Sequence, residues 1–171
     1  MINSRRTFLK QTLTGSLFLV SARALGHSLL DSDTPDSLKY LSTKEFLIVQ
    51  AVAARIIGLD ETSPMPASDV ASRADVFLST ADPEVQYQFH TLLNAFNAPF
   101  FTFLFDWRFS SFIHMSAEDQ DSYLEDWMTS NFAFRRTGFQ ALKRVCLSMY
   151  YTDSRSWREI HYDGMFLPWE R

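Results

Sequence analysis

Residues 41–58 read LSTKEFLIVQAVAARIIG, and this stretch indicates the fold class most directly. Ser42 and Glu45 have the spacing of a capping box, in which the serine hydroxyl and the glutamate carboxylate each accept a backbone N–H at the start of a helix. Leu41 and Phe46 have the spacing of the hydrophobic staple across that start. The apolar residues fall on one side of such a helix: Phe46, Val49, Val52, Ala53, Ile56 and Ile57. Because glycine commonly follows the last turn of a helix, we expect this amphipathic helix to end at Gly58.

Similar signals recur along the rest of the chain. Asp82-Pro83-Glu84 predicts a helix start, because it places a capping residue, a first-turn proline and an acid at the positive end of a helix. Ser116 with Asp119 predicts another start. Further helices are expected at about 68–80, from 83, over 117–130, over about 132–151 and from 153 or 154. Their apolar residues include Val70, Ala74, Phe77, Leu78, Val85, Phe89, Leu92, Leu93, Phe96, Leu124, Met128, Phe139, Leu142, Val145, Cys146, Met149 and Ile160. The pattern predicts an all-α fold, a single compact helical domain of about six helices after a cleaved N-terminal signal.

The segment from Pro99 to Ile113 is ambiguous. Its aromatic residues alternate as they would in a strand, yet they also gather on helical faces. We expect a helix that loosens after Trp107, because no other segment offers a strand to pair with and a lone strand is not stable. Eight of the seventeen residues from Phe96 to Phe112 are Phe or Trp, so this segment is either buried on all sides or meets a partner.

Charge and cysteine content exclude several classes of function. The 171 residues carry a formal net charge of −4, and the first 24 contain four basic residues and no acid, so the remainder has a charge of −8. Nucleic-acid binding needs a basic footprint, and anionic lipid surfaces also attract basic segments, so neither partner is expected. Cys146 is the only cysteine, which excludes an internal disulfide and a multi-cysteine zinc site.

The N-terminus matches a twin-arginine export signal. The motif S-R-R-x-F-L-K is formed by Ser4, Arg5, Arg6, Phe8, Leu9 and Lys10. A short apolar stretch over 12–21 follows, and Ala22-Arg23-Ala24 provides the small residues Ala22 and Ala24 of a cleavage site. The apolar stretch of about 10 residues is far below the roughly 20 that a membrane-spanning helix needs. We therefore expect a signal peptide over 1–24, a polar tether over 25–40 and a helical domain over 41–171, exported to the periplasm.

The export route raises a question about cofactors. The twin-arginine translocase carries proteins that are already folded, and its typical cargo has a cofactor inserted in the cytoplasm. The chain has no G-x-G-x-x-G, no phosphate-binding loop and no G-x-S-x-G elbow, and its four histidines are isolated. We expect no catalytic, cofactor-binding or metal-binding residues in this chain. It either holds a cofactor through an unrecognised site or escorts a folded partner.

The second half of the chain carries an ordered set of motifs that resembles a known family. The set is Arg108-Phe109-Ser110, the helix capped by Ser116, Trp127-Met128-Thr129-Ser130, Arg135-Arg136-x-x-Phe139-x-x-Leu142-Lys143, Tyr150-Tyr151 and Trp157-x-x-Ile160-x-Tyr162-x-Gly164. With the first helix and the twin-arginine start, this order resembles the gluconate 2-dehydrogenase small subunit (subunit 3) family. The chain departs from the family pattern at Gly58, the 64–67 turn, His161 and Met165.

The resemblance implies a division of labour. Small subunits of this type pair with a large FAD-dependent oxidoreductase of the glucose-methanol-choline class, often with a multihaem cytochrome c that takes the electrons. The small subunit supplies the export signal and supports maturation, and it is not expected to be catalytic alone. Candidates for partner binding are Phe101, Phe105, Trp107, Phe109, Trp127, Arg135, Arg136, Tyr150, Tyr151 and Trp157. An independent periplasmic binding or structural domain, or an enzyme with an unrecognised site, remain the alternatives.

Overall fold

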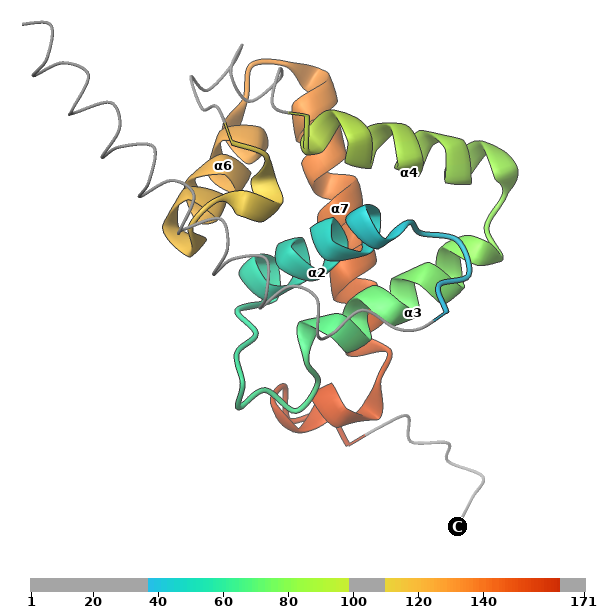
Figure 1. Ribbon diagram of the computed structural model, residues 1–171. Helices are drawn as coiled ribbons and strands as arrows, with labels where there is room; N and C mark the ends of the chain where they lie inside the picture. The colour runs from blue at the N-terminus through green and yellow to red at the C-terminus, as the bar shows by residue number, and fades with distance from the viewer. Residues whose placement is uncertain (1–36, 99–109, 164–171) are drawn as a thin grey trace, which may run out of the picture. The chain divides into compact units, whose positions relative to one another are not determined.

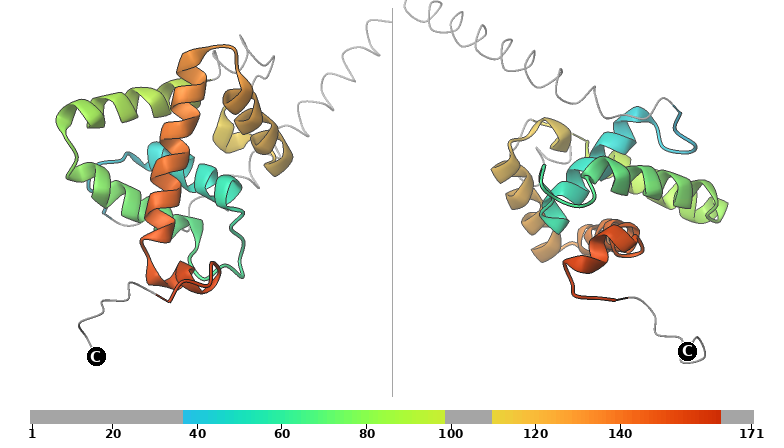
Figure 2. Two further views of the ribbon diagram at one scale, coloured as in Figure 1. Left: turned by 180° about the vertical axis from the view of Figure 1, so that it is seen from behind. Right: turned by 90° about the horizontal axis from the view of Figure 1, so that it is seen from below.

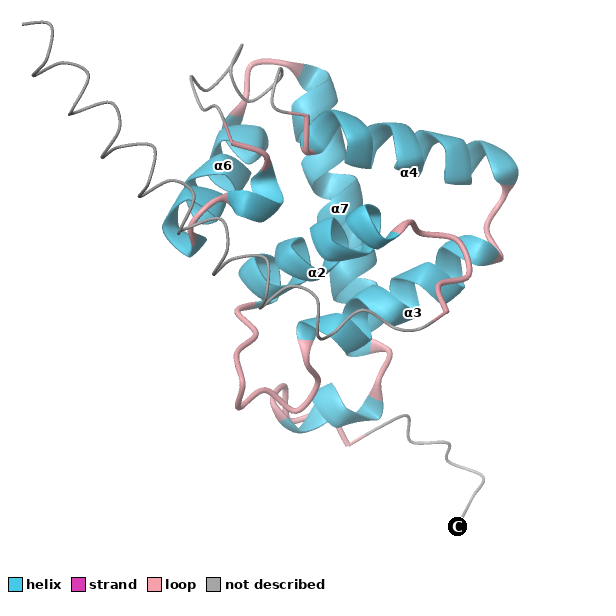
Figure 3. Ribbon diagram, viewed as in Figure 1, coloured by secondary structure: helices cyan, strands magenta, loops and turns pink. Residues whose placement is uncertain are grey.

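The computed structural model describes residues 37–98 and 110–163, and these form helices joined by loops (Figures 1 and 3). The α-helices are α2 (Thr43–Ile57), α3 (Ala67–Ser79), α4 (Pro83–Phe96), α6 (Ala117–Thr129) and α7 (Ala133–Tyr151). Two short 3-10 helices, η1 (Phe112–His114) and η2 (Ser154–Arg158), accompany them. The described ranges contain no strand, so the all-α prediction is confirmed for them.

Several predicted residues lie outside the described ranges. They are the export-signal residues Ser4, Arg5, Arg6, Phe8, Leu9 and Lys10, the cleavage-site residues Ala22 and Ala24, and the aromatic candidates Phe101, Phe105, Trp107 and Phe109. The predictions made for these residues stay predictions.

Helix α2 lies at the centre of the described helices (Figure 1). It packs against α3 and α7, and it also contacts α4, α6 and η1. Helix α7 is the longest described helix and packs against α2, α3 and α6. It passes behind α2 in Figure 1 and lies nearest the viewer in the left panel of Figure 2. The inner side of α7 therefore faces the other helices, and its outer side does not.

The helix ends follow the predicted signals. The backbone N–H of Ser42 donates to Glu45 Oε2 at 2.9 Å, and the Ser42 hydroxyl accepts the N–H of Glu45 at 3.4 Å, which completes the capping box. Gly58 follows α2 in the left-handed conformation, with φ of 79°. Asp82 caps α4 through the N–H of Glu84 at 2.8 Å. These local predictions are confirmed because each depends only on residues that are close in sequence.

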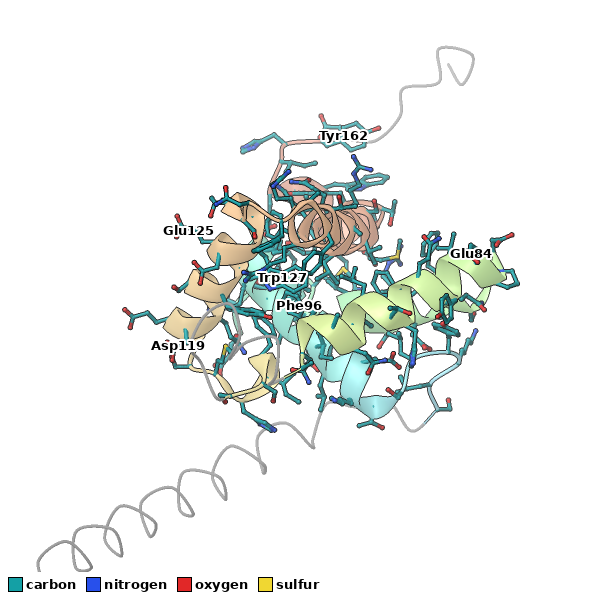
Figure 4. The ribbon with its side chains drawn as sticks, turned by 90° about the horizontal axis from the view of Figure 1, so that it is seen from above. Glu84, Phe96, Asp119, Glu125, Trp127 and Tyr162 are labelled. Carbon is teal, nitrogen blue, oxygen red and sulfur yellow. The ribbon has the colours of Figure 1, made fainter. Side chains whose placement is uncertain are left out.

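The core is built from the predicted apolar stripes, but four of the predicted apolar residues are exposed: Phe77, Val85, Met128 and Ile160. The fully buried residues include Phe46, Val49, Val52, Ala53, Val70, Ala74, Leu78, Leu93, Phe96 and Leu142. Phe77, which we expected to face inward, is 47% exposed because Ala71 and Asp75 occupy the inward side of α3. Val85 is 47% exposed in the first turn of α4, at the outer end of that helix, where Figure 4 marks Glu84. Met128 is 45% exposed on α6.

A buried carboxylate of α3 fixes the chain just before α2. Asp75 accepts three backbone N–H groups: that of Lys39 at 2.7 Å through Oδ2, and those of Tyr40 at 2.8 Å and Leu41 at 2.7 Å through Oδ1. Asp75 is itself buried, and Leu41 belongs to the core. Lys39 and Tyr40, which the sequence placed in the polar tether, are therefore held on the domain. The tether prediction is corrected at this end.

Replacing Asp75 with alanine should strongly destabilise the domain. Asp75→Ala leaves three backbone N–H groups without their acceptor, and each such loss costs about 1–3 kcal/mol, so we expect the free energy of unfolding to fall by about 3 kcal/mol or more. Asp75→Asn should cost less, because its one remaining oxygen can still accept from Tyr40 and Leu41. Urea unfolding followed by circular dichroism measures both. Asp69→Ala, which removes only a solvent-accessible ion pair with Arg155, is the control and should cost less than about 1 kcal/mol. Equal unfolding midpoints for Asp75→Ala and Asp69→Ala would contradict the stabilising role of the Asp75 carboxylate.

Candidate partner-binding face of helix α7

Helix α7 separates a buried side from a charged outer side. Its buried residues are Arg135, Gly138, Phe139, Leu142, Cys146 and Tyr150. Arg136, Gln140 and Arg144 follow one another at four-residue intervals on the opposite side, and all three are exposed. No described element lies in front of α7 in the left panel of Figure 2. We call the exposed side, formed by Arg136, Gln140, Arg144 and Tyr151, the α7 face.

The α7 face is positively charged. None of the 19 residues of α7 is acidic, and four are basic. Nη1 of Arg136 donates to the backbone carbonyl of Ser130 at 2.5 Å, which leaves the charge of the guanidinium without a carboxylate. Within the described ranges, Arg144 has no hydrogen bond or ion pair from its side chain. These two arginines therefore present charge that an acidic surface can neutralise.

Aromatic residues adjoin the C-terminal end of the α7 face. Tyr151 is 41% exposed, and the indole Nε1–H of Trp157 donates to the carbonyl of Tyr151 at 3.0 Å. The rings of Trp157 and Tyr162 meet edge to face, with centroids 5.1 Å apart. His161 adopts a left-handed conformation with φ of 52°, and the N–H of Tyr162 donates to the carbonyl of Trp157 at 3.0 Å. This turn brings Tyr162 back toward Trp157, and Figure 4 shows Tyr162 at the outer edge of the domain.

Three predicted partner-binding residues are buried instead. Trp127 is 2% exposed, Tyr150 1% and Arg135 5%, so none of them presents its side chain to a partner. Burial raises the pKa of Tyr150, with a further contribution from its hydrogen bond to Glu159. The sequence assigned these residues as interface candidates because large aromatic and arginine side chains serve both cores and interfaces. Of the remaining described candidates, Arg136 and Tyr151 are exposed on the α7 face, and Trp157 lies beside it, half-buried.

The buried side of α7 rests on an aromatic cluster. The ring of Phe96 meets those of Phe112, Tyr123 and Trp127 edge to face, with centroids 4.7, 5.1 and 4.8 Å apart. Figure 4 shows Phe96 and Trp127 side by side between α4, α6 and α7. The guanidinium carbon of Arg135 lies 5.3 Å from the centroid of Trp127 and 6.0 Å from that of Tyr123. This cation–π arrangement accounts for a charged residue on the buried side and gives α7 a rigid support.

The adjacent residues Arg135 and Arg136 lie on opposite sides of α7, the first buried and the second exposed. Nη1 of Arg136 contacts the carbonyl of Ser130. Sequence reasoning missed Gln140 and Arg144, although their four-residue spacing from Arg136 could have indicated them. It also missed Tyr162 as a contact of Trp157, which only the turn at His161 brings about.

Other reactive side chains offer no catalytic arrangement in the described part of the chain. Burial raises the pKa of the Cys146 thiol to about 12, so this thiol stays protonated at neutral pH. Nδ1 of His90 lies 2.5 Å from Oε1 of Glu45, and its ring also contacts Asn94. Among the described residues, no group of three or more His, Cys, Asp or Glu could hold a metal ion. No helix in these ranges combines the length and apolarity needed to cross a bilayer.

Comparison of the chain with protein-family models, with curated proteins and with solved structures finds no match. The functional interpretation therefore depends on the residues of this chain and on their arrangement.

Substitutions of Arg135 and Arg136 test which side of α7 faces the core. Arg135→Ala removes the cation–π contacts and the buried stem, so we expect the free energy of unfolding to fall by about 2 kcal/mol or more. Arg136→Ala should change it by less than about 0.5 kcal/mol, because an exposed substitution removes little packing. Denaturant unfolding of both variants gives the comparison. If Arg136→Ala lowers the free energy of unfolding more than Arg135→Ala does, then Arg136 and not Arg135 faces the core.

Proposed function

We propose that the chain is the non-catalytic small subunit of an exported FAD-dependent dehydrogenase of the glucose-methanol-choline class. It supplies a twin-arginine signal and a docking surface on which the large flavoprotein subunit matures. The observation that carries this proposal is the α7 face, a long exposed helix side with two arginines and adjoining aromatic residues. The ordered motifs that resemble the gluconate 2-dehydrogenase small-subunit family support it from the sequence.

The α7 face has the composition of an interface rather than of an ordinary surface. Arginine, tyrosine and tryptophan are the residues most enriched among those that dominate binding energy. Arg136 and Arg144 supply charge, and Tyr151 and Trp157 supply large amphipathic rings at one end. Because the rest of the exported chain is acidic, this basic strip directs an acidic patch of a partner to one side of the domain.

The export route fits a domain that accompanies another folded protein. The large subunit would receive FAD in the cytoplasm, bind the small subunit and cross the membrane with it under the direction of Arg5 and Arg6. FAD belongs to the large subunit in this proposal, and a multihaem cytochrome c would receive the electrons in the periplasm. The small subunit is then a single helical domain of about six helices that follows a cleaved signal.

Reversing charge on the α7 face should release the partner. A tagged chain purified from its native host should carry a flavoprotein, measured by FAD fluorescence after denaturation and identified by mass spectrometry. We expect the double variant Arg136→Glu, Arg144→Glu to lower the bound FAD at least tenfold, because two attractive contacts become repulsive. The control Lys39→Glu, Lys44→Glu changes the net charge equally at exposed positions of another part of the domain. A wild-type chain that carries no flavoprotein would contradict the proposed function.

Changing the twin arginines should leave the dehydrogenase in the cytoplasm. In an Arg5→Lys, Arg6→Lys variant we expect flavin-dependent dehydrogenase activity to disappear from the periplasmic fraction and to accumulate in the cytoplasm. Fractionation with an activity assay and an immunoblot of both subunits measures the distribution. Normal periplasmic activity in this variant would show that the partner has its own route, and the escort role would be wrong.

A further inference from the structure

Two strips of opposite charge lie on neighbouring helices of the domain. Helices α6 and α7 follow one another in the chain and pack against each other. Helix α6 contains five acidic residues and no basic one, whereas α7 contains four basic residues and no acidic one. This part of the surface therefore has a negative side and a positive side.

The negative strip is formed by Glu118 and Glu125 of α6. Both residues are exposed, and their spacing of seven places them on the same side of the helix, about 10 Å apart along its axis. Neither carboxylate forms an ion pair within the described ranges. Figure 4 shows Glu125 on the outer side of α6, where a second molecule can reach it. We call this pair of glutamates the α6 strip.

Two basic side chains lie close to α6 and reduce its negative charge only in part. Arg55 of α2 binds Asp121 through two hydrogen bonds, one of them from Nε to Oδ1 at 2.6 Å, so these two charges satisfy each other. Lys143 is half-buried and lines the same hollow as Glu125, but the two form no ion pair. Five acids against two bases leave a net charge of −3 around α6.

The positive strip is the α7 face. Arg136 and Arg144 are exposed and lie eight residues apart, which corresponds to about 12 Å along the helix axis. Neither guanidinium has a carboxylate partner in the described part of the chain. The spacing of these two positive charges is close to that of the two negative charges of the α6 strip, and long side chains can adjust to the small difference.

The two strips are complementary under two-fold symmetry. Because they belong to neighbouring helices of one chain, a two-fold axis between two copies can set the α6 strip of each copy against the α7 face of the other. Glu118 and Glu125 of one copy then meet Arg136 and Arg144 of the other, and the same contacts repeat on the other side of the axis. An unrelated acidic surface would use the α7 face alone and leave the α6 strip without a partner.

We infer that two copies of this chain associate through these two strips. Exposed ion pairs are individually weak and are screened by salt, so the association is reversible and weakens as the ionic strength rises. Its consequence for the flavoprotein rests on the proposed function. Because the same α7 face is the proposed docking surface for the large subunit, a second copy covers that face until the flavoprotein displaces it.

Sedimentation velocity of the full chain tests the association. We expect dimers at about 0.05 M NaCl and an association constant at least tenfold lower at about 0.5 M NaCl, because the shorter Debye length screens the ion pairs. At low salt, Glu118→Lys, Glu125→Lys should also lower the association constant at least tenfold. The control Glu61→Lys, Glu84→Lys makes the same change of net charge at exposed positions of other elements and should change it less than twofold. A wild-type chain that is monomeric at both salt concentrations would overturn the inference.

Mixing two reversed variants tests the pairing of the strips. Arg136→Glu, Arg144→Glu should also fail to associate alone, because both of its strips are then acidic. Glu118→Lys, Glu125→Lys has two basic strips, so an equimolar mixture of the two variants should form a mixed dimer with an affinity close to that of the wild type. Misfolding of either variant could not produce this rescue. If both variants are helical by circular dichroism and no mixed dimer forms, the pairing of α6 with α7 is wrong.

Binding of the co-purified flavoprotein, measured by biolayer interferometry, separates this inference from the proposed function. Glu118→Lys, Glu125→Lys should bind the flavoprotein at least as tightly as the wild type does, since its α7 face is intact and no second copy covers it. A monomeric wild-type chain that binds the flavoprotein would overturn the self-association and leave the proposed function intact. A chain that dimerises as expected but binds no flavoprotein would contradict the proposed function alone. A monomeric chain that cosediments with phosphatidylglycerol vesicles would assign the α7 face to a lipid surface and overturn the inference.

Discussion

The structure depends on the close approach of α7 to the aromatic cluster at Gly138. A Cβ atom at this position would lie 2.8 Å from Cζ3 of Trp127 and 2.6 Å from Cδ1 of Leu92, both closer than packed carbon atoms normally come. Glycine costs up to about 1 kcal/mol in a helix interior relative to alanine. Here the missing side chain lets the backbone of α7 rest on Trp127, which is itself packed against Phe96.

This contact fixes the rotation of α7 and, with it, the surface that the domain presents. With Gly138 turned inward, Arg135 lies over the rings of Trp127 and Tyr123, and Arg136 must point outward. The aromatic rings below the guanidinium stabilise its charge on the buried side of the helix. The α7 face follows from this rotation of the helix.

Local signals in the sequence predicted most helix ends. Contacts between residues far apart in sequence determine which side chains are buried, and these contacts could not be predicted. Ser42 with Glu45, Gly58 and Asp82 act within a few residues of themselves, so their roles were readable. Asp75 accepts the backbone N–H groups of Lys39, Tyr40 and Leu41, which are more than 30 residues away in sequence. The sequence pattern of α3 does not indicate that one of its carboxylates faces inward. Trp127 and Tyr150 could not be separated from Tyr151 and Trp157, because the same side chains serve a core or an interface. Only tertiary packing distinguishes them: Trp127 and Tyr150 are buried, whereas Tyr151 is 41% exposed.

The charges of the described helices are segregated between two neighbours, α6 and α7. Helix α6 carries five acidic residues and no basic one, while the neighbouring α7 carries four basic residues and no acid. A partner patch of negative charge is repelled along α6 and attracted along α7, so one approach is favoured over the others before any apolar contact forms. A groove lies where these two helices meet α2, and Glu125 and Lys143 bring one charge of each sign to its rim. The opposite charges of these adjacent helices would therefore orient any charged surface that approaches the domain.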